Sequence, residues 1–367
     1  MRKLSIVHTE SSLGWGGQEI RILSESQGLI RRGHEVKLVC PPEARIFAEA
    51  PAWEVPRFPM PIARKRPAGL KFLMEWLRDN PCDVVCTHSS TDSWLAAIAL
   101  MALGRPYPMV RMRHISAPVP RNLLSRWLYT RATRRIVTAG EALKKELVSR
   151  NGFPAARIHS VPTGVDAQRF RPAPDPIAVR KQLGMGLGTY IGIVATLRSW
   201  KGHRYLLDAL PEGTKLLIVG DGPQLENIQK QVRSLGIEAR VRFAGNQKDV
   251  VPWLQAIDIF ALPSYANEGV PQALVQAMLV GLPCVTTAIG SIPELANDGE
   301  TALVVPPGDV PSLKKALERL AGDAALRKQL GAAARRHAEA GFSYDGMLDR
   351  MEAIYASVAG IPLIRMG

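Results

Sequence analysis

The stretch "KLSIVHTESSLGWGGQEIRILSESQGLIRRG" at residues 3–33 contains a short apolar run, a glycine-rich segment and a long segment with helical spacing. This order predicts a strand, a tight turn and a helix. The same alternation continues through "HEVKLVC" (34–40), "LKFLMEWLRDN" (70–80), "DVVCTH" (83–88) and "TDSWLAAIALMAL" (91–103). Strands that alternate with helices indicate βα units and a parallel, doubly wound sheet.

The pattern is interrupted once and then restarts. Residues 166–178, "DAQRFRPAPDPIA", concentrate prolines without any period, which is typical of a domain linker. Strand-like runs return at "YIGIVATL" (190–197), "TKLLIVG" (214–220), "DIFALPS" (258–264) and "PCVTTA" (283–288). Because 367 residues also exceed the usual size of one core, we predict two α/β domains, with a ligand cleft opposite the carboxyl ends of both sheets.

Charge is distributed unevenly between the two halves. Residues 1–175 contain 27 Lys and Arg against 15 Asp and Glu, a net +12, whereas residues 176–367 contain 20 against 18, a net +2, which together give the total of +14. A basic first half predicts an anionic partner there, and nucleic acid, a phosphorylated glycan and an acidic membrane surface all fit this feature.

The chain shows no sign of membrane insertion or of disulfides. The first apolar run is interrupted at His8 too soon for a signal peptide, and the longest, at 94–104, is about half of a bilayer-spanning helix. The four cysteines stand in strand-like apolar settings, as small buried residues do in a reducing compartment. We therefore expect a cytoplasmic protein.

Two turns after strands contain residue types that bind phosphate. Gly14, Gly16 and Gly17 follow the first strand and precede a helix, where free backbone amides attract phosphate, although a tight turn without a ligand fits equally well. Arg198 and Lys201 follow the first strand of the second domain, where two cations would neutralise a diphosphate. Because the chain has no D-x-D and no H-E-x-x-H motif, we expect this chemistry to need no metal.

"YANEGVPQALVQAM" (265–278) places an acid, Glu268, just before a short predicted helix. The free amides of Gly269, Val270 and Gln272 would hold a phosphate at the helix start, and the carboxylate would accept hydrogen bonds from sugar hydroxyls. Gln276, further along the helix, would reach a ribose. The alternative interpretation is that Glu268 only caps the helix and that Gln276 lies on the surface.

Taken together, the motifs resemble those of a known family. The segments at 137–147, 161–172, 195–210, 216–228, 241–264, 267–285 and 290–309 occur in the order found in the retaining glycosyltransferases of family 4, which are enzymes of the GT-B type. The resemblance implies two facing Rossmann-like domains, here 1–168 and 169–344. It also implies that the last segment, 345–367, crosses back to the first domain. Transfer of a hexose-type sugar from a nucleoside-diphosphate sugar, of UDP or GDP type, to an acceptor hydroxyl is the implied reaction.

The resemblance also assigns roles to individual residues. It implies that Arg198 and Lys201 bind the diphosphate, that the loop of Gly16 and Gly17 closes over it, and that Glu268 binds hydroxyls of the donor sugar. His114, at the end of a first-domain strand, is implied to face that sugar, and the backbone at Gln247 to meet the nucleobase. The family's second glutamate is Gln276 in this chain, which still accepts a hydroxyl hydrogen bond but has no charge.

The acceptor and the exact activity are left open by the sequence. Basic amphipathic segments at 64–78 and 121–136 favour peripheral contact with an anionic membrane and a lipid-linked or lipopolysaccharide-type glycan acceptor, although ordinary solvated helices would look similar. No motif indicates nucleic-acid binding. A sugar-nucleotide epimerase of the same fold and a non-catalytic nucleotide-sugar-binding protein remain as alternatives.

Overall fold

The computed structural model describes residues 2–115 and 117–361 and divides into two compact units. Unit 1 comprises Met1–Pro162 with Asp345–Gly367, and unit 2 comprises Thr163–Tyr344. The sequence placed the domain boundary between residues 168 and 169, six residues after the division between Pro162 and Thr163 in the structure. Of the predicted closing segment 345–367, residues 362–367 lie outside the described part.

Unit 1 contains a seven-stranded sheet with the strand order β3-β2-β1-β4-β5-β6-β7, and every pairing is parallel. The order reverses between β1 and β4, which are direct neighbours, so the loops after these two strands diverge at the carboxyl edge of the sheet. The strands are β1 (Ser5–Thr9), β2 (Glu35–Cys40), β3 (Arg57–Pro59), β4 (Val84–Thr87), β5 (Met109–Arg113), β6 (Arg135–Thr138) and β7 (Ile158–Ser160).

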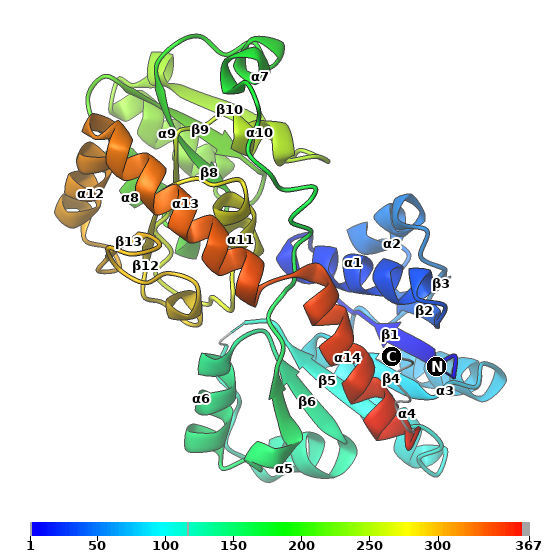
Figure 1. The fold of residues 1–367 in the computed structure, drawn as a ribbon. Helices are drawn as coiled ribbons and strands as arrows, with labels where there is room; N and C mark the ends of the chain where they lie inside the picture. The colour runs from blue at the N-terminus through cyan, green and yellow to red at the C-terminus, as the bar shows by residue number, and fades with distance from the viewer. Residues whose placement is uncertain (1, 116, 362–367) are drawn as a thin grey trace. The chain divides into compact units, whose positions relative to one another are not determined.

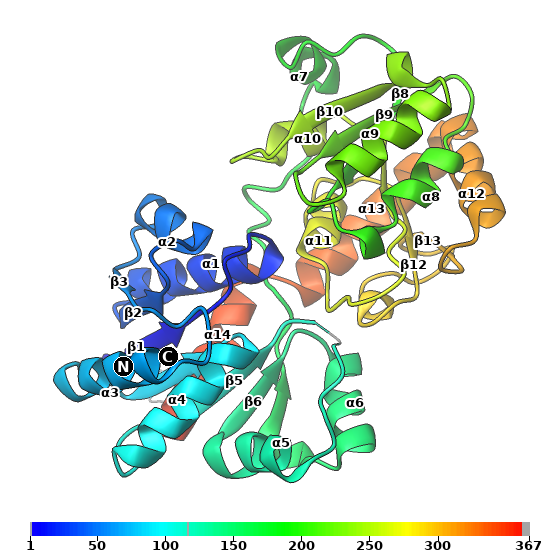
Figure 2. The same cartoon turned by 180° about the vertical axis from the view of Figure 1, so that it is seen from behind.

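Helices cover both faces of this sheet. Figure 1 shows α1 and α14 over one face, and Figure 2 shows α3 and α4 over the other. Central strands are apolar on both sides for this reason, and Val7 and Val85 are fully buried. The helices are α1 (Gly17–Arg31), α2 (Arg45–Glu49), α3 (Pro67–Asp79), α4 (Ser90–Ala102), α5 (Leu123–Trp127), α6 (Glu141–Asn151) and α14 (Tyr344–Ala359).

The last helix, α14, is attached to unit 1 by a charged cluster. Arg32, which follows α1, donates to Asp349 at 2.8 Å and to Glu352 at 2.7 Å, and it also contacts Asp345. Glu352 is buried and also contacts His34 Nε2 at 2.9 Å. Charge-assisted hydrogen bonds of this kind fix the position of the helix along α1.

Unit 2 contains a six-stranded parallel sheet with the order β10-β9-β8-β11-β12-β13. The order again reverses between the first strand of the unit, β8, and its neighbour β11. The strands are β8 (Thr189–Val194), β9 (Thr214–Val219), β10 (Val241–Gly245), β11 (Ile259–Leu262), β12 (Cys284–Thr287) and β13 (Leu303–Val305).

The helices of unit 2 bury a continuous apolar core against this sheet. In Figure 1, α11 and α13 lie over one face, and Figure 2 shows α8 and α9 over the other. The helices are α7 (Pro176–Gln182), α8 (His203–Asp208), α9 (Leu225–Ser234), α10 (Val251–Gln255), α11 (Gln272–Leu279), α12 (Val310–Gly322) and α13 (Ala324–Gly341). The prediction of two doubly wound parallel-sheet domains is confirmed.

Two local predictions differ from the structure. The linker predicted at 166–178 overlaps α7, which begins at Pro176 and is capped by the Asp175 carboxylate through the amides of Ile177 and Ala178. The amphipathic segment at 121–136 is not one regular helix, because α5 ends at Trp127 and a π-helical turn follows over Leu128–Ala132.

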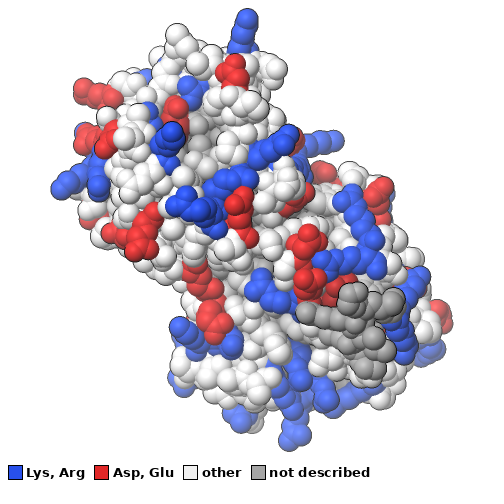
Figure 3. Space-filling model, viewed as in Figure 1, with Lys and Arg blue, Asp and Glu red and all other residues white. Residues whose placement is uncertain are grey.

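The surface near α5 is basic and partly apolar. Arg121, Arg126, Arg131 and Arg134 are exposed, and Figure 3 shows Lys and Arg gathered along this lower margin of unit 1. Between them, Leu123 is 83% exposed and Leu124 is 67% exposed. Among the helices in the described ranges, none combines the length and the apolar character that crossing a membrane requires.

Candidate active site

The carboxyl edge of the unit 2 sheet brings together two of the predicted loops. The turn after β8 contains Arg198 and Lys201, and the loop after β11 contains Glu268. Since β8 and β11 are hydrogen-bonded neighbours at the order reversal, their following loops start side by side at the carboxyl edge of the sheet. The two loops are also joined directly, because the amide of Tyr265 donates to the Trp200 carbonyl at 2.9 Å.

Lys201 and Glu268 form a largely buried ion pair. Lys201 Nζ lies 2.7 Å from Glu268 Oε1, and the exposed fractions of the two side chains are 19% and 5%. Ser264 Oγ donates to the same carboxylate oxygen at 2.6 Å. Glu268 is therefore not a simple helix cap; the N-cap of α11 is Pro271, which makes no side-chain cap hydrogen bond. The pair provides a fixed cation and a fixed acceptor side by side.

The backbone around Glu268 has little freedom to move. Asn267 adopts a left-handed conformation with φ 56°, which is uncommon for a residue with a side chain. Gly290, in the loop after β12, packs so closely that a Cβ there would lie 2.0 Å from the Glu268 carbonyl oxygen. Gly202 meets the same loop from the other turn, with a Cβ position 2.0 Å from the Pro263 carbonyl oxygen. These approaches require glycine and hold the carboxylate in place.

Two further glycines support the turn that contains Arg198. A Cβ on Gly220 would lie 2.0 Å from the Ala195 carbonyl oxygen, and one on Gly222 would lie 2.8 Å from the backbone of Leu197. The amide of Leu197 also donates to the Asp221 carbonyl at 3.0 Å. Arg198 itself is exposed, and its guanidinium lies over the Trp200 ring at 5.3 Å. A closely packed turn therefore presents an exposed cation to solvent.

The amino end of α11 offers unpartnered backbone donors. Within the described ranges, the amides of Gly269, Val270 and Gln272 have no hydrogen-bond partner, as expected for a helix start that lacks a capping side chain. Gln276 is 8% exposed, so it is not a surface residue. Gln247, in the loop after β10, is half-buried, and its side-chain amide donates to the Ala244 carbonyl. That hydrogen bond does not involve the Gln247 backbone.

His203, the first residue of α8, is a buried neighbour of this site that the sequence did not single out. Its side chain is buried, and neither ring nitrogen has a hydrogen-bond partner within the described part of the chain. Burial lowers the pKa of His203 to about 3, and the nearby Lys201 cation contributes to the shift. The imidazole is thus neutral at physiological pH and adds no charge beside the ion pair.

In unit 1, the glycine-rich loop is tied to a buried acid, Glu10. Gly16 is the N-cap of α1 and Gly17 its first residue. The Ser12 amide donates to Glu10 Oε1 at 2.7 Å, and the Gln18 amide group and the Ser89 hydroxyl also donate to this carboxyl group. Burial raises the pKa of Glu10 to about 8, and the neighbouring Asp92 carboxylate raises it further. The loop is therefore anchored by an acid that is largely uncharged near pH 7.

Asp92 links the same loop to the neighbouring strand. It accepts from the Thr9 hydroxyl at 2.9 Å and from the amides of His88 and Ser89, also at 2.9 Å, so that Ser89 and Asp92 form a capping box at the start of α4. Burial raises the pKa of Asp92 to about 6, despite these donors.

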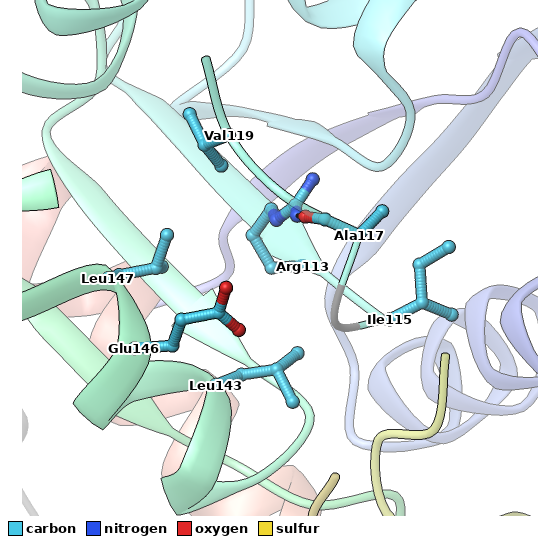
Figure 4. A pocket seen from close by; sticks show the side chains of 7 residues that line it. All are labelled: Arg113, Ile115, Ala117, Val119, Leu143, Glu146 and Leu147. Atoms are coloured by element: carbon cyan, nitrogen blue, oxygen red, sulfur yellow. Dashed lines mark hydrogen bonds between the residues drawn. The ribbon is translucent and has the colours of Figure 1, made fainter. Parts of the chain in front are cut away.

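His114 follows β5 and is half-buried. Its Nε2 lies 2.9 Å from His88 Nδ1, and His88 Nε2 lies 2.8 Å from His8 Nδ1. A small pocket lies near this end of β5 (Figure 4). It is lined by Arg113, Ile115, Ala117 and Val119 on one side and by Leu143, Glu146 and Leu147 of α6 on the other. Its walls are mostly apolar, with the carboxylate of Glu146 directed into the space between them.

Several of these residues were missed in the sequence although a signal was present. "HTESS" (8–12) and "THSST" (87–91) are polar runs that directly follow buried strands, and residues at the carboxyl ends of neighbouring strands meet at one edge. Ser264 follows β11 in the same way. Gly290 had no such signal, because its close approach to Glu268 depends on the packing of two loops.

Two family models match the chain, one in each half. Residues 15–169 match the family model described as Glycosyltransferase Family 4, and residues 188–323 match the one described as Glycosyl transferases group 1. The two matched ranges lie one after the other and together cover most of the sequence.

Characterised proteins with similar sequences are glycosyltransferases. The chain is 34% identical over 200 residues to a GDP-mannose-dependent α-(1-6)-phosphatidylinositol monomannoside mannosyltransferase of Mycolicibacterium smegmatis, covering 50% of this chain and 52% of that protein. It is 26% identical to the 2-deoxystreptamine glucosyltransferase of Streptomyces kanamyceticus, over 84% of this chain and 90% of that protein. A lipopolysaccharide core biosynthesis glycosyltransferase, LpsE of Rhizobium meliloti, is 31% identical over 43% of this chain and 46% of its own length. The alignment thus spans about half the length of most of these relatives.

Solved structures share the fold over nearly the whole chain. A glycosyltransferase from Rickettsia africae has a TM-score of 0.86 at 19% identity, covering 98% of this chain and 99% of that one. Anabaena HepE in complex with UDP-glucose has a TM-score of 0.87 at 21% identity, covering 96% and 100%. At this level of identity the likeness shows the fold, which is the predicted GT-B type.

Proposed function

Since the chain belongs to the family 4 (group 1) glycosyltransferases, as its sequence resemblance predicted, we propose that it transfers a sugar from a nucleoside-diphosphate sugar to a glycan or lipid-linked acceptor, with retention of anomeric configuration. The observation that carries this proposal is the Lys201–Glu268 pair, 2.7 Å apart, at the start of α11, where the amides of Gly269, Val270 and Gln272 have no partner among the described residues. A cation and free amides suit a diphosphate, and a fixed carboxylate suits sugar hydroxyls.

In this proposal the leaving diphosphate is stabilised without a metal. Lys201 and the exposed Arg198 supply positive charge, and the amides of Gly269, Val270 and Gln272 supply hydrogen bonds that strengthen as charge develops on the leaving group. Glu268 holds the sugar, and the contact with Lys201 at 2.7 Å keeps that carboxylate aligned.

We propose contacts for the nucleoside and for the residues of unit 1 as well. Gln276 contacts the ribose through its amide, and the backbone at Gln247 meets the base. The loop of Gly16 and Gly17, held by Glu10, covers the diphosphate, and His114 binds the sugar. Donors of UDP or GDP type are proposed because the relatives include a GDP-mannose-dependent enzyme and HepE has been solved with UDP-glucose.

The basic margin near α5 supports a membrane-linked acceptor. Leu123 and Leu124 are exposed between arginines, and an anionic bilayer attracts such a segment while burying its apolar side chains. We therefore propose peripheral binding to the inner face of the cytoplasmic membrane and a lipid-linked or lipopolysaccharide-type acceptor. The buried, unpaired cysteines support a reducing compartment.

Thermal unfolding with a panel of UDP- and GDP-sugars, in the presence of a chelator, tests the donor site. We expect one donor to raise the Tm of the wild type and to do so much less in Glu268→Gln, whereas Glu300→Gln, an exposed carboxylate of the same unit, behaves as wild type. A shift that is equal in both variants would contradict the role of Glu268.

Product analysis then separates the possible reactions. Transfer releases the nucleoside diphosphate and forms a new glycosidic bond, whose anomeric configuration is read by NMR. An isomerised donor without release would indicate an epimerase, and binding without turnover across an acceptor panel would indicate a non-catalytic sugar-nucleotide-binding protein.

A further inference from the structure

Three histidines form a chain inside unit 1. His8 on β1, His88 after β4 and His114 after β5 come from neighbouring strands of the sheet. The rings of His8 and His88 stack with centroids 5.1 Å apart, and those of His88 and His114 with centroids 5.2 Å apart. The ring of Tyr355, from α14, meets the His8 ring edge-on with centroids 6.3 Å apart.

Each link is a contact between two ring nitrogens. His88 uses both of its nitrogens, Nε2 toward His8 Nδ1 at 2.8 Å and Nδ1 toward His114 Nε2 at 2.9 Å. Burial lowers the pKa of all three imidazoles, and for His88 and His114 nearby cationic or imidazole groups lower it further. Each ring is therefore neutral and has one N–H and one lone pair.

Neutral rings in such contacts must all point the same way. If His8 donates from Nδ1, His88 must accept at Nε2 and donate from Nδ1, so that His114 accepts at Nε2 and has its own N–H on Nδ1. If the chain runs in reverse, all three rings have the N–H on Nε2. The tautomer of His114 is thus coupled to that of His8, two links away.

The inner end of the chain favours the first direction. His8 Nε2 is buried and has no hydrogen-bond partner within the described residues. The reverse direction would place an N–H at this position, and buried N–H groups without an acceptor are rarer in proteins than unfilled acceptors. The nearby Cys86 sulfur is only a weak acceptor, and it already accepts from the Tyr355 hydroxyl at 3.3 Å. In the first direction His8 Nε2 has a lone pair instead of a proton, so no buried N–H is left without an acceptor.

The outer end of the chain is available to a ligand. His114 is half-buried, and its Nδ1 makes no hydrogen bond within the described ranges, because its one ring contact is through Nε2. In the favoured direction this nitrogen has the proton, so His114 offers a neutral, oriented donor. A sugar oxygen is uncharged, so a neutral N–H donor suits it and a cationic donor is not needed.

A metal ion is a poorer explanation of the cluster. His8, Cys86 and His88 present ligand atoms within 4.8 Å of one another. Both nitrogens of His88 already bind other imidazoles, so a cation held by all three residues would have to replace one of these contacts.

We propose that His8 and His88 are positioning residues that hold His114 as the Nδ1–H tautomer, from which it donates a hydrogen bond to a sugar oxygen of the substrate. This inference rests on the proposed function for the identity of the ligand, whereas the tautomer is a property of the free protein. The two parts can therefore be tested separately.

NMR of the full-length protein labelled with ¹⁵N-histidine tests the tautomer, and the seven histidines keep the spectrum simple. His114 is assigned from the signal lost in His114→Gln. We expect long-range ¹H–¹⁵N correlations of the Nδ1–H pattern for His8, His88 and His114 at neutral pH. An Nε2–H pattern or an imidazolium for His114 in the wild type would overturn the proposal, whether or not a substrate is known.

The ligand is tested in the same spectra. UDP-glucose and GDP-mannose are titrated beside UDP, GDP and free glucose or mannose. We expect the His114 signals to move with one of the sugar nucleotides and not with the nucleoside diphosphate alone; a shift with the free sugar instead would place the contact on the acceptor side. If a sugar nucleotide binds with no shift at His114 and no sugar causes one, the ligand part of the proposal is wrong while the donor site of unit 2 stands.

Two substitutions at His8 test the coupling. Asparagine places a side-chain N–H near the position of Nδ1, so His8→Asn should keep the tautomer of His114 and a kcat within about twofold of wild type. His8→Met places only an acceptor, its thioether sulfur, near this position. His88 should then donate from Nε2, so the Nε2–H form of His114 should appear and kcat/KM should fall between about twofold and tenfold, as for the loss of one neutral hydrogen bond. His159→Gln, on β7 outside the chain, is the control. Unchanged spectra and turnover in a folded His8→Met variant would overturn the coupling.

Discussion

Substitution of Gly290 by alanine tests whether the geometry of the Glu268 loop determines donor binding. The Cβ that alanine adds at this position would lie 2.0 Å from the Glu268 carbonyl oxygen, whereas real Cβ contacts are essentially never under 3.0 Å. The loop must therefore move by about 1 Å, which would lengthen the Glu268 contacts with Lys201, at 2.7 Å, and with Ser264, at 2.6 Å, beyond hydrogen-bonding range.

The magnitude follows from the interactions lost. Alanine at the left-handed φ of 60° costs about 1 kcal/mol, and the loss of two charge-assisted hydrogen bonds to a buried carboxylate costs about 3 kcal/mol more. We expect Gly290→Ala to lower the free energy of unfolding of unit 2 by about 4 kcal/mol. If Glu268 grips the sugar, donor affinity should fall by about tenfold or more.

Gly299→Ala is the matched control, because Gly299 has a similar φ of 74° but no atom within 4 Å of its Cβ position. Urea unfolding of both variants should give a loss of about 1 kcal/mol for the control. Donor-induced thermal shifts then compare binding in the two proteins. Equal stability and equal donor affinity in the two variants would refute the view that the Gly290 contact holds Glu268 in position.

Three further predictions concern pH, helix attachment and the surface. The folded pKa of His203 is about 3, below its unfolded value, so the unfolded chain binds more protons between pH 6.5 and 3 and the free energy of unfolding falls as pH falls. Urea unfolding at pH 8 and at pH 5 measures this loss. Replacing His203 by phenylalanine should recover about 2 kcal/mol of it. Arg32→Ala should lower the free energy of unfolding by about 2 kcal/mol and expose α14 to limited proteolysis, whereas Arg31→Ala, whose side chain is 65% exposed, should cost under about 0.5 kcal/mol. Leu124→Ser should weaken binding to anionic vesicles in a sedimentation assay, and Leu187→Ser, at an equally exposed site in unit 2, should not; equal binding of the two variants would contradict a membrane role for the α5 margin.

The sequence predicted the two sheets well, because each central strand is an apolar run bounded by turn residues. Short edge strands were not predicted: β3 and β7 have three residues each, too few to show a period. Helix α7 was interpreted as part of a linker because it has no buried residues and therefore no apolar stripe that indicates a helix. Asp175 and Pro176 nevertheless form a regular helix start.

Within the site, the sequence identified residues better than it identified contacts. Arg198, Lys201 and Glu268 were selected because each follows a strand, but the ion pair joins residues 67 positions apart and depends on β8 lying beside β11. The histidine chain needs the neighbour order β1-β4-β5, which no local pattern contains. His8 was instead considered only as an interruption of an apolar run. Long-range pairing of this kind is decided by packing.

The two units place different chemistry at equivalent points of their sheets. Beside β8 and β11, unit 2 has a buried ion pair, an exposed arginine and backbone amides without a partner among the described residues, which together suit an anion. Beside β1 and β4, unit 1 has neutral imidazoles and a buried acid, Glu10, whose pKa of about 8 leaves it mostly protonated near pH 7. Groups of this kind exchange hydrogen bonds with hydroxyls without attracting ions. This difference supports the proposal that unit 2 binds the diphosphate and that His114 of unit 1 binds a sugar oxygen.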